Sequence, residues 1–217
     1  MKKFINNWYI ISVFLAIATF LLTIFGPWDF TQKTILALIV CLFLHFYEEF
    51  GFPGGFPYMG VKVLLGRDEL DPKKWGANNL NSIFGNWGFL LFVYILPLFL
   101  PNVRFLTVAA IIFSFLECLM HLVLFNVRLK TFYNPGFITA VFGMTPIAIY
   151  YFIHIAGQNL YYWHDYVIAF IWCVIVFLFC FRSPVYWKLG KKEGYPFTLR
   201  SAFGLELKHI NHHSNIS

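Results

Sequence analysis

Residues 34–57 read TILALIVCLFLHFYEEFGFPGGFP. An apolar run over 34–50 ends in His45, Glu48 and Glu49, and a Gly/Pro turn follows at once. An apolar run of about 17–25 residues can cross the hydrocarbon layer of a bilayer as one helix. Ionisable side chains at membrane depth are rare and usually functional. This stretch therefore predicts a membrane-spanning helix and marks the place where a site is expected.

The composition agrees with a membrane protein. The chain has 217 residues, of which 59% are hydrophobic and 12% charged, whereas a soluble domain carries roughly 25% charged residues. Lipid is therefore the expected solvent for most of the surface, and the bilayer is the expected partner. The formal charge of +6 is not interpreted as a nucleic-acid footprint, because the positions of the charges matter more than their sum.

Six apolar stretches predict an all-α bundle of about six transmembrane helices, because lipid offers no partners for free backbone groups. They cover residues 8–26, 34–50, 83–101, 103–127, 137–156 and 165–181. We expect one transmembrane domain over 1–181, interrupted by a long loop at 51–82, and a basic, aromatic tail over 182–217. Pro97 and Pro146 fall inside apolar stretches, where bends are expected.

The distribution of Lys and Arg predicts the orientation. With the N-terminus in the cytoplasm, all but Lys33 and Arg104 of the 16 Lys and Arg residues lie on the cytoplasmic side, as the positive-inside rule requires. Both termini are then cytoplasmic, and the plasma membrane of a prokaryote is the expected location. His209, His212 and His213 end a tail that we interpret as solvated or in contact with lipid headgroups.

Two predicted helices carry most of the ionisable groups at membrane depth. At 100° per residue, His45, Glu48 and Glu49 fit within an arc of about 100°. Glu117 and His121 are four residues apart and share a face of the fourth predicted span. Both histidines are expected roughly 9–10 Å from the cytoplasmic boundary. The two clusters can therefore meet in the cytoplasmic half of the bundle.

Two imidazoles and up to three carboxylates suit a divalent metal such as Zn, Fe or Mn. We expect His45, Glu49, Glu117 and His121 as ligands, with Glu48 and Glu49 as candidate catalytic residues. The same groups without a metal could carry out acid–base chemistry. The structural alternative is a buried polar network that only fixes helix packing.

His45-Phe46-Tyr47-Glu48-Glu49 resembles the defining motif of the HXXEE family of membrane proteins. A second histidine, His121, and a Tyr-x-Pro-Gly element, Tyr133-Asn134-Pro135-Gly136, complete the resemblance in the same order. The likeness implies which residues form a site and implies no reaction. Pro135 and Gly136 fit a turn that starts the fifth span, with Asn134 as its N-cap. Alternatively, Tyr133 or Asn134 forms a wall of the site.

Three functions remain open from the sequence. The first is a membrane enzyme, a hydrolase or oxidoreductase, acting on a hydrophobic small molecule or a membrane-embedded peptide. In it, Asn86 and Arg128 join Tyr133 and Asn134 as substrate-binding or wall residues. The second is a proton-coupled transporter or carrier that uses the same Glu/His cluster as a relay. The third is a non-catalytic scaffold. The sequence assigns no oligomeric state and no role to Cys41 or Cys118.

Overall fold

The computed structural model describes residues 1–207, and within this range it contains helices and no strand. The α-helices are α1 (Lys2–Ile5), α2 (Trp8–Phe25), α3 (Phe30–Phe50), α4 (Phe56–Leu64), α5 (Asn79–Phe89), α6 (Leu96–Phe99), α7 (Arg104–Cys118), α8 (Asn126–Leu129), α9 (Thr145–Ile155), α10 (Trp163–Arg182), α11 (Pro184–Gly190) and α12 (Leu199–Phe203). Two segments, η1 (Pro72–Lys74) and η5 (Gly204–Glu206), are 3₁₀-helical, and three, η2 (Leu90–Ile95), η3 (Leu119–Phe125) and η4 (Thr139–Met144), are π-helical. The predicted all-α class is confirmed.

Five helices are long and apolar enough to cross a membrane, which indicates a membrane protein. They are Trp8–Phe25, Phe30–Phe50, Asn79–Phe99, Arg104–Leu129 and Trp163–Gly190. The fifth predicted span, 137–156, corresponds to a shorter apolar helix, Thr139–Ile155. The count of six spans and the cytoplasmic placement of the termini stay predictions.

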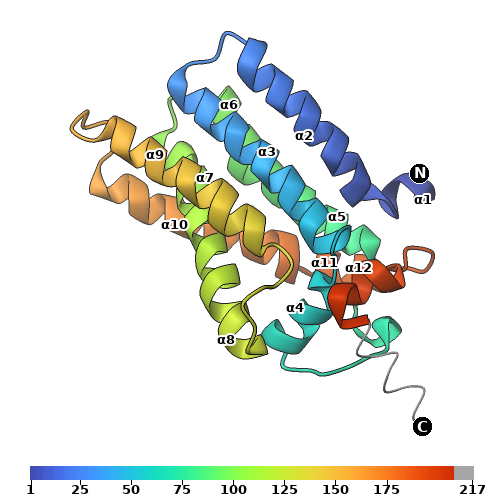
Figure 1. Ribbon diagram of the computed structural model, residues 1–217. Helices are drawn as coiled ribbons and strands as arrows, with labels where there is room; N and C mark the ends of the chain where they lie inside the picture. Colours follow the sequence, from blue (N-terminus) through green and yellow to red (C-terminus); the bar gives the residue numbers. More distant parts are fainter. Residues whose placement is uncertain (208–217) are drawn as a thin grey trace.

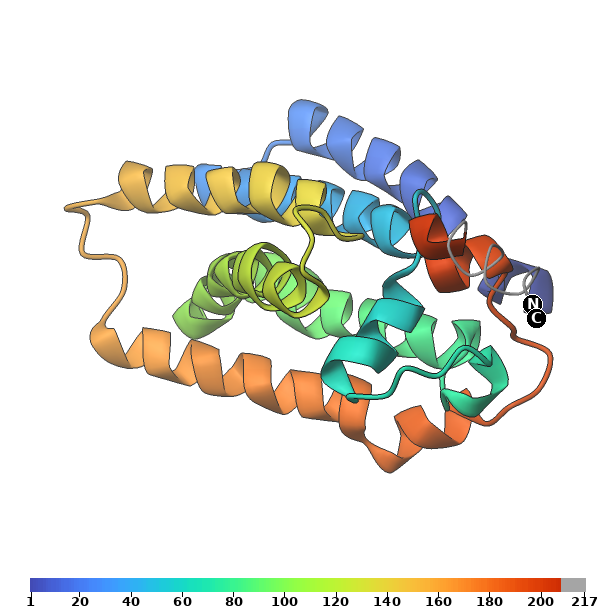
Figure 2. The ribbon, with the colours of Figure 1, turned by 60° about the horizontal axis from the view of Figure 1, so that its bottom comes forward.

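The helices form layers that are clearest in Figure 2. Helices α2, α3 and α9 lie on one side, α5–α6 and α7–α8 occupy the middle, and α10 with α11 lies on the far side. Helices α1, α4 and α12 gather at one end of the bundle, and the α2–α3 and α9–α10 turns lie at the opposite end (Figure 1). We call the first the α4 end. The candidate site lies in the half of the bundle nearest to it.

Two of the π-helical segments come directly before an intrahelical proline. Pro97 follows η2, and Pro146 follows η4. Proline cannot donate the i→i−4 hydrogen bond and its ring pushes away the preceding turn, so the widened π turn relieves both problems. The bends predicted at these prolines therefore coincide with π segments. The third segment, η3, contains no proline and holds His121 instead.

Polar side chains fix the chain at the α4 end. Asn78 caps α5, and its side-chain nitrogen also donates to the backbone carbonyls of Leu189, Gly190 and Lys192 at distances of 2.9–3.1 Å. Helix α12 packs on α4. The described part of the predicted tail thus lies against the predicted loop 51–82. His209, His212 and His213 lie outside the described residues.

Candidate metal centre

The C-terminal end of α3 carries three buried ionisable side chains. His45, Glu48 and Glu49 are at most 6% exposed. Their carboxylates point to different partners, although the two glutamates are adjacent in sequence. Glu49 joins His45 at one site, while Glu48 turns toward the start of the helix over 139–155. The segment His45–Glu49 therefore supplies His45 and Glu49 to one cluster and Glu48 to the start of the 139–155 helix.

Four side chains from α3, α7 and η3 converge on one point. The Nε2 atom of His45 lies 3.4 Å from Glu49 Oε1 and 3.7 Å from Glu117 Oε2. The Nε2 atom of His121 lies 3.6 Å and 3.4 Å from the same two oxygens. The ligand atoms of His45, Glu117 and His121 all lie within 4.8 Å of one another. The convergence predicted from helical spacing is thus present.

These four distances fit ligands around an ion better than direct ion pairs. A charge-assisted N–H···O bond is about 2.7–2.9 Å long, so all four contacts are too long for good hydrogen bonds. Metal–ligand bonds of about 2.0–2.1 Å in a tetrahedron separate neighbouring ligand atoms by about 3.3–3.4 Å. The four His–Glu distances of 3.4–3.7 Å are close to that value. The group whose ligand atoms all lie within 4.8 Å of one another comprises His45, Glu117 and His121, without Glu49.

The far nitrogen of His121 is held by the turn before α9. Its Nδ1 lies 2.6 Å from Asn134 Oδ1, and Asn134 Nδ2 lies 2.7 Å from the His121 backbone oxygen. A carbonyl oxygen can only accept, so the amide nitrogen must face it and the amide oxygen must face the ring. The ring therefore donates from Nδ1, so that a neutral His121 has its lone pair on Nε2, which faces the centre.

His45 is held in the same way by Thr139. Its Nδ1 lies 2.9 Å from Thr139 Oγ1, and that hydroxyl donates to Glu48 Oε2 over 2.6 Å. The single hydroxyl proton is used toward the carboxylate, so the oxygen accepts from the ring. In a neutral His45 ring the lone pair then lies on Nε2, as it does in a neutral His121 ring. Histidines that ligate a metal commonly donate their other N–H to an oxygen in this manner.

Gly136 gives both imidazoles the space to approach the turn. Its φ is +98°, and a Cβ atom there would lie 2.3 Å from His121 Cε1 and 2.7 Å from His45 Cε1. Only glycine meets both conditions at little cost. The predicted requirement for close approach at the Tyr-x-Pro-Gly element is thereby explained.

Glu48 caps the helix over 139–155 from a distance of some ninety positions in sequence. Its carboxylate accepts from the backbone N–H groups of Ile138 and Thr139 at 3.0 and 2.9 Å, and from the Tyr133 hydroxyl at 3.1 Å. A negative charge is favourable at a helix N-terminus. Burial and the neighbouring carboxylate raise the pKa of Tyr133, which keeps the phenol a donor.

The capping role predicted for Asn134 is therefore taken by Glu48. Asn134 uses its side chain on His121 and on Asn126 Oδ1. Both predicted wall residues contact motif residues. Tyr133 donates a hydrogen bond to Glu48, and Asn134 accepts one from His121. The sequence could not predict that Glu48 and Glu49 have different partners, because those partners depend on which helix packs beside each side chain.

A cavity of about 610 Å³ opens next to the centre. His45, Glu49, Glu117 and His121 all line it, and Glu117 is the most accessible of them, with 18% of its side chain exposed. Most of the remaining lining is aromatic or aliphatic. This volume lies within the range of small-molecule sites, which are mainly apolar with a few polar groups.

The predicted wall residues divide between the cavity and its surroundings. Asn86 lines the cavity, whereas Arg128 is exposed on α8 and does not belong to the lining. Arg182, at the end of α10, lines it instead, as do Ser82 and Tyr186. Sequence analysis missed these three, and only their place near a predicted span end pointed to them.

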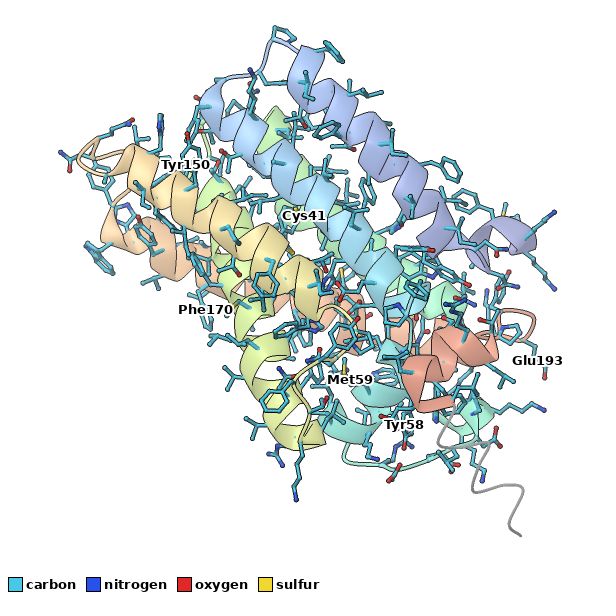
Figure 3. The ribbon with its side chains drawn as sticks, in the orientation of Figure 1. Cys41, Tyr58, Met59, Tyr150, Phe170 and Glu193 are labelled. Carbon is cyan, nitrogen blue, oxygen red and sulfur yellow. The ribbon has the colours of Figure 1, made fainter. Side chains whose placement is uncertain are left out.

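The two unassigned cysteines lie beside the centre rather than in the cavity. Neither Cys41 nor Cys118 is among the residues that line it. Cys41 lies in the middle of α3 (Figure 3), and its sulfur would be 3.2 Å from a Cβ atom placed on Gly143 of η4. Cys41 thus packs closely against η4, where Gly143 makes room for it.

The arrangement of these residues agrees with the family comparison. A family described as proteins of unknown function with an HXXEE motif matches residues 35–151. This range contains all four residues of the centre and the turn that holds them. No curated protein and no solved structure gives a significant match to the chain. Because the match covers more than half of the sequence, the chain belongs to the HXXEE-motif family.

Proposed function

We propose that this protein is a membrane enzyme that holds one divalent metal ion between His45, Glu49, Glu117 and His121 and acts on a hydrophobic substrate in the adjoining cavity. One observation carries the proposal. Both imidazoles donate from Nδ1 to oxygen atoms and aim Nε2 at two carboxylates, at the spacing of metal ligands. A divalent ion would supply Lewis-acid chemistry there.

The residues around the ion have distinct parts in this proposal. Glu117, with the largest exposure among the four, can take up a proton from a group in the cavity. Glu48 is occupied by donors from the 133–139 segment and so acts as a positioning residue, through Thr139, on His45. The mainly apolar lining suits a hydrophobic substrate. Buried carboxylates without a cation would be costly, which also favours a bound ion.

The carrier hypothesis receives less support. A relay needs polar groups that continue from the cluster to the opposite end of the bundle. On the way there, the core contains the fully buried apolar side chains Leu38, Val93 and Ile111. None of these three side chains lines the cavity.

The test is the metal content of the protein purified in detergent and dialysed against Zn, Fe or Mn. We expect about one ion per chain, retained through gel filtration, as for a closed set of N and O ligands. His121→Ala and Glu117→Gln should each lose it. His154→Ala is the matched control, because this histidine stacks on Phe30 away from the centre. A parent protein that retains none of the three metals would refute the proposal.

A further inference from the structure

We propose that the cavity binds a single-chain amphiphile with an anionic head group, whose head pairs with Arg182 and whose hydrocarbon chain extends into the bilayer between η3 and α10. This inference rests on the proposed function for the reaction and adds the class of substrate. The anionic head is a carboxylate or a phosphate. Four observations lead to it.

The first observation is an unneutralised cation in the lining. Arg182 is exposed at the end of α10, where its guanidinium lies 5.5 Å from the centre of the Phe177 ring. Its Nη1 atom donates only to the neighbouring backbone oxygen of Phe181, at 3.3 Å. Among residues 1–207, no Asp or Glu forms an ion pair with it. The fork of an arginine suits carboxylate and phosphate groups.

The second observation is that hydrogen-bonding groups from other helices line the same cavity. Ser82 and Asn86 come from α5, one turn apart, and Tyr186 comes from α11. Helix α11 packs on α5, and α10 packs on both. A polar head near Arg182 therefore has further donors within the same wall.

The third observation is an apolar opening that faces lipid. Leu119 of η3 and Phe170 of α10 line the cavity, yet they are 57% and 51% exposed. Phe177, two turns after Phe170, is 39% exposed and also lines it. Figure 3 marks Phe170 on α10. Because these side chains belong to helices that can cross a membrane, the space between η3 and α10 opens toward the hydrocarbon layer.

The fourth observation is the charge balance. Two carboxylates and a divalent ion sum to zero, and the histidines are neutral when they act as ligands. The net charge of the cavity lining is then the positive charge of Arg182. A cationic head would meet the uncompensated positive charge of Arg182, and like charges repel each other. An anionic head is the complementary partner.

The experiment is equilibrium binding of radiolabelled oleate to the full-length protein in a nonionic detergent, with metal content measured on the same preparation. Lysophosphatidate, neutral monoolein and a cationic alkylammonium serve as competitors. We expect saturable binding, displacement by oleate and lysophosphatidate, and displacement by monoolein or the alkylammonium only at about tenfold higher concentration or more. The stronger of the two anionic competitors identifies the head group.

Arg182→Gln should weaken oleate binding about tenfold and remove the preference over monoolein. Arg128→Gln is the matched control, since this arginine does not line the cavity. Gly60→Leu is a second variant, because a Cβ atom at this lining residue meets only the Phe56 ring, at 3.8 Å. The added side chain should weaken all ligands alike.

Equal affinity for oleate and monoolein, or equal losses in Arg182→Gln and Arg128→Gln, would overturn the proposal. The assay measures binding and not turnover, so its outcome is independent of the metal test. Arginine-dependent oleate binding by a metal-free protein would leave this inference standing and the metalloenzyme refuted. A metal-containing protein without that binding would give the reverse result.

Discussion

On one wall of the cavity, the polar side chains of α3 and η3 are held from behind by hydrogen bonds to the 133–139 segment. On the opposite wall, α10 and α11 present mainly aromatic and aliphatic side chains and one unpaired arginine. The residues that match the HXXEE family, 35–151, include the first wall and end before α10. The first wall brings two imidazoles within 3.4–3.7 Å of two carboxylates. The second offers shape and charge, which suits it to the choice of substrate.

Gly136→Ala should give the largest effect, because it attacks the first wall at its tightest point. The new Cβ atom would collide with both imidazoles at a residue with positive φ. We expect loss of bound metal and a cost of about 1–3 kcal/mol in the free energy of unfolding. Metal analysis and thermal unfolding measure the two effects.

Gly60→Ala provides the comparison, since Gly60 lies on α4 with its nearest neighbour at 3.8 Å. It should keep the metal and gain up to about 1 kcal/mol from helix propensity. If both alanine variants behaved alike, the close approach at Gly136 would not matter.

Asn134→Leu should come next in size. It removes the acceptor for His121 Nδ1 and leaves that nitrogen buried without a partner. Loss of such a partner lowers metal affinity about 10–100-fold, which a competition titration with a metal chelator can measure. Asn86→Leu on the cavity side should leave the affinity unchanged. Similar losses of metal affinity in both variants would show that Asn134 has no special role in orienting His121.

Thr139→Val should weaken metal binding by about tenfold, at the low end of such effects. It removes the hydroxyl that accepts from His45 and donates to Glu48, although Glu48 keeps its backbone donors. Thr139→Ser retains the hydroxyl and should restore the affinity in the same titration. A serine variant as weak as the valine variant would show that the methyl group, and not the hydroxyl, is required.

The smallest effect is expected in the loop at the α4 end, outside both walls. Asp68 accepts hydrogen bonds from Tyr58 and Lys62, which lower the pKa of its carboxyl. The ionised Asp68 carboxylate therefore stabilises the folded state at pH values above its unfolded-state pKa of about 3.9. This contribution disappears as the pH falls through the lower folded-state pKa.

Asp68 is largely exposed, so Asp68→Asn should cost less than about 1 kcal/mol at pH 7. Unfolding curves of parent and variant should converge toward pH 3. A difference that grows in acid would contradict this sign.

Helical periodicity was sufficient to predict the centre. His45 and Glu49, like Glu117 and His121, are four residues apart on long apolar runs, and such pairs must share a face. Periodicity could not predict that Glu48 faces the start of η4, because its angle on α3 is compatible with either neighbour. Arg182 was missed for a related reason, since hydropathy does not say which helices stand side by side. The π segments left a signal only where Pro97 and Pro146 follow them.

The capping of one helix by a carboxylate from another has a consequence for how the chain is assembled during synthesis. The donors to Glu48 come from residues 133–139, which leave the ribosome long after α3. Until then the charge has no partner in the protein, and its carboxylate must remain hydrated at the membrane surface. The C-terminal end of α3 can therefore take its final depth only when the helix over 139–155 arrives. The hydrogen bonds that orient His45 and His121 form at that moment and not before.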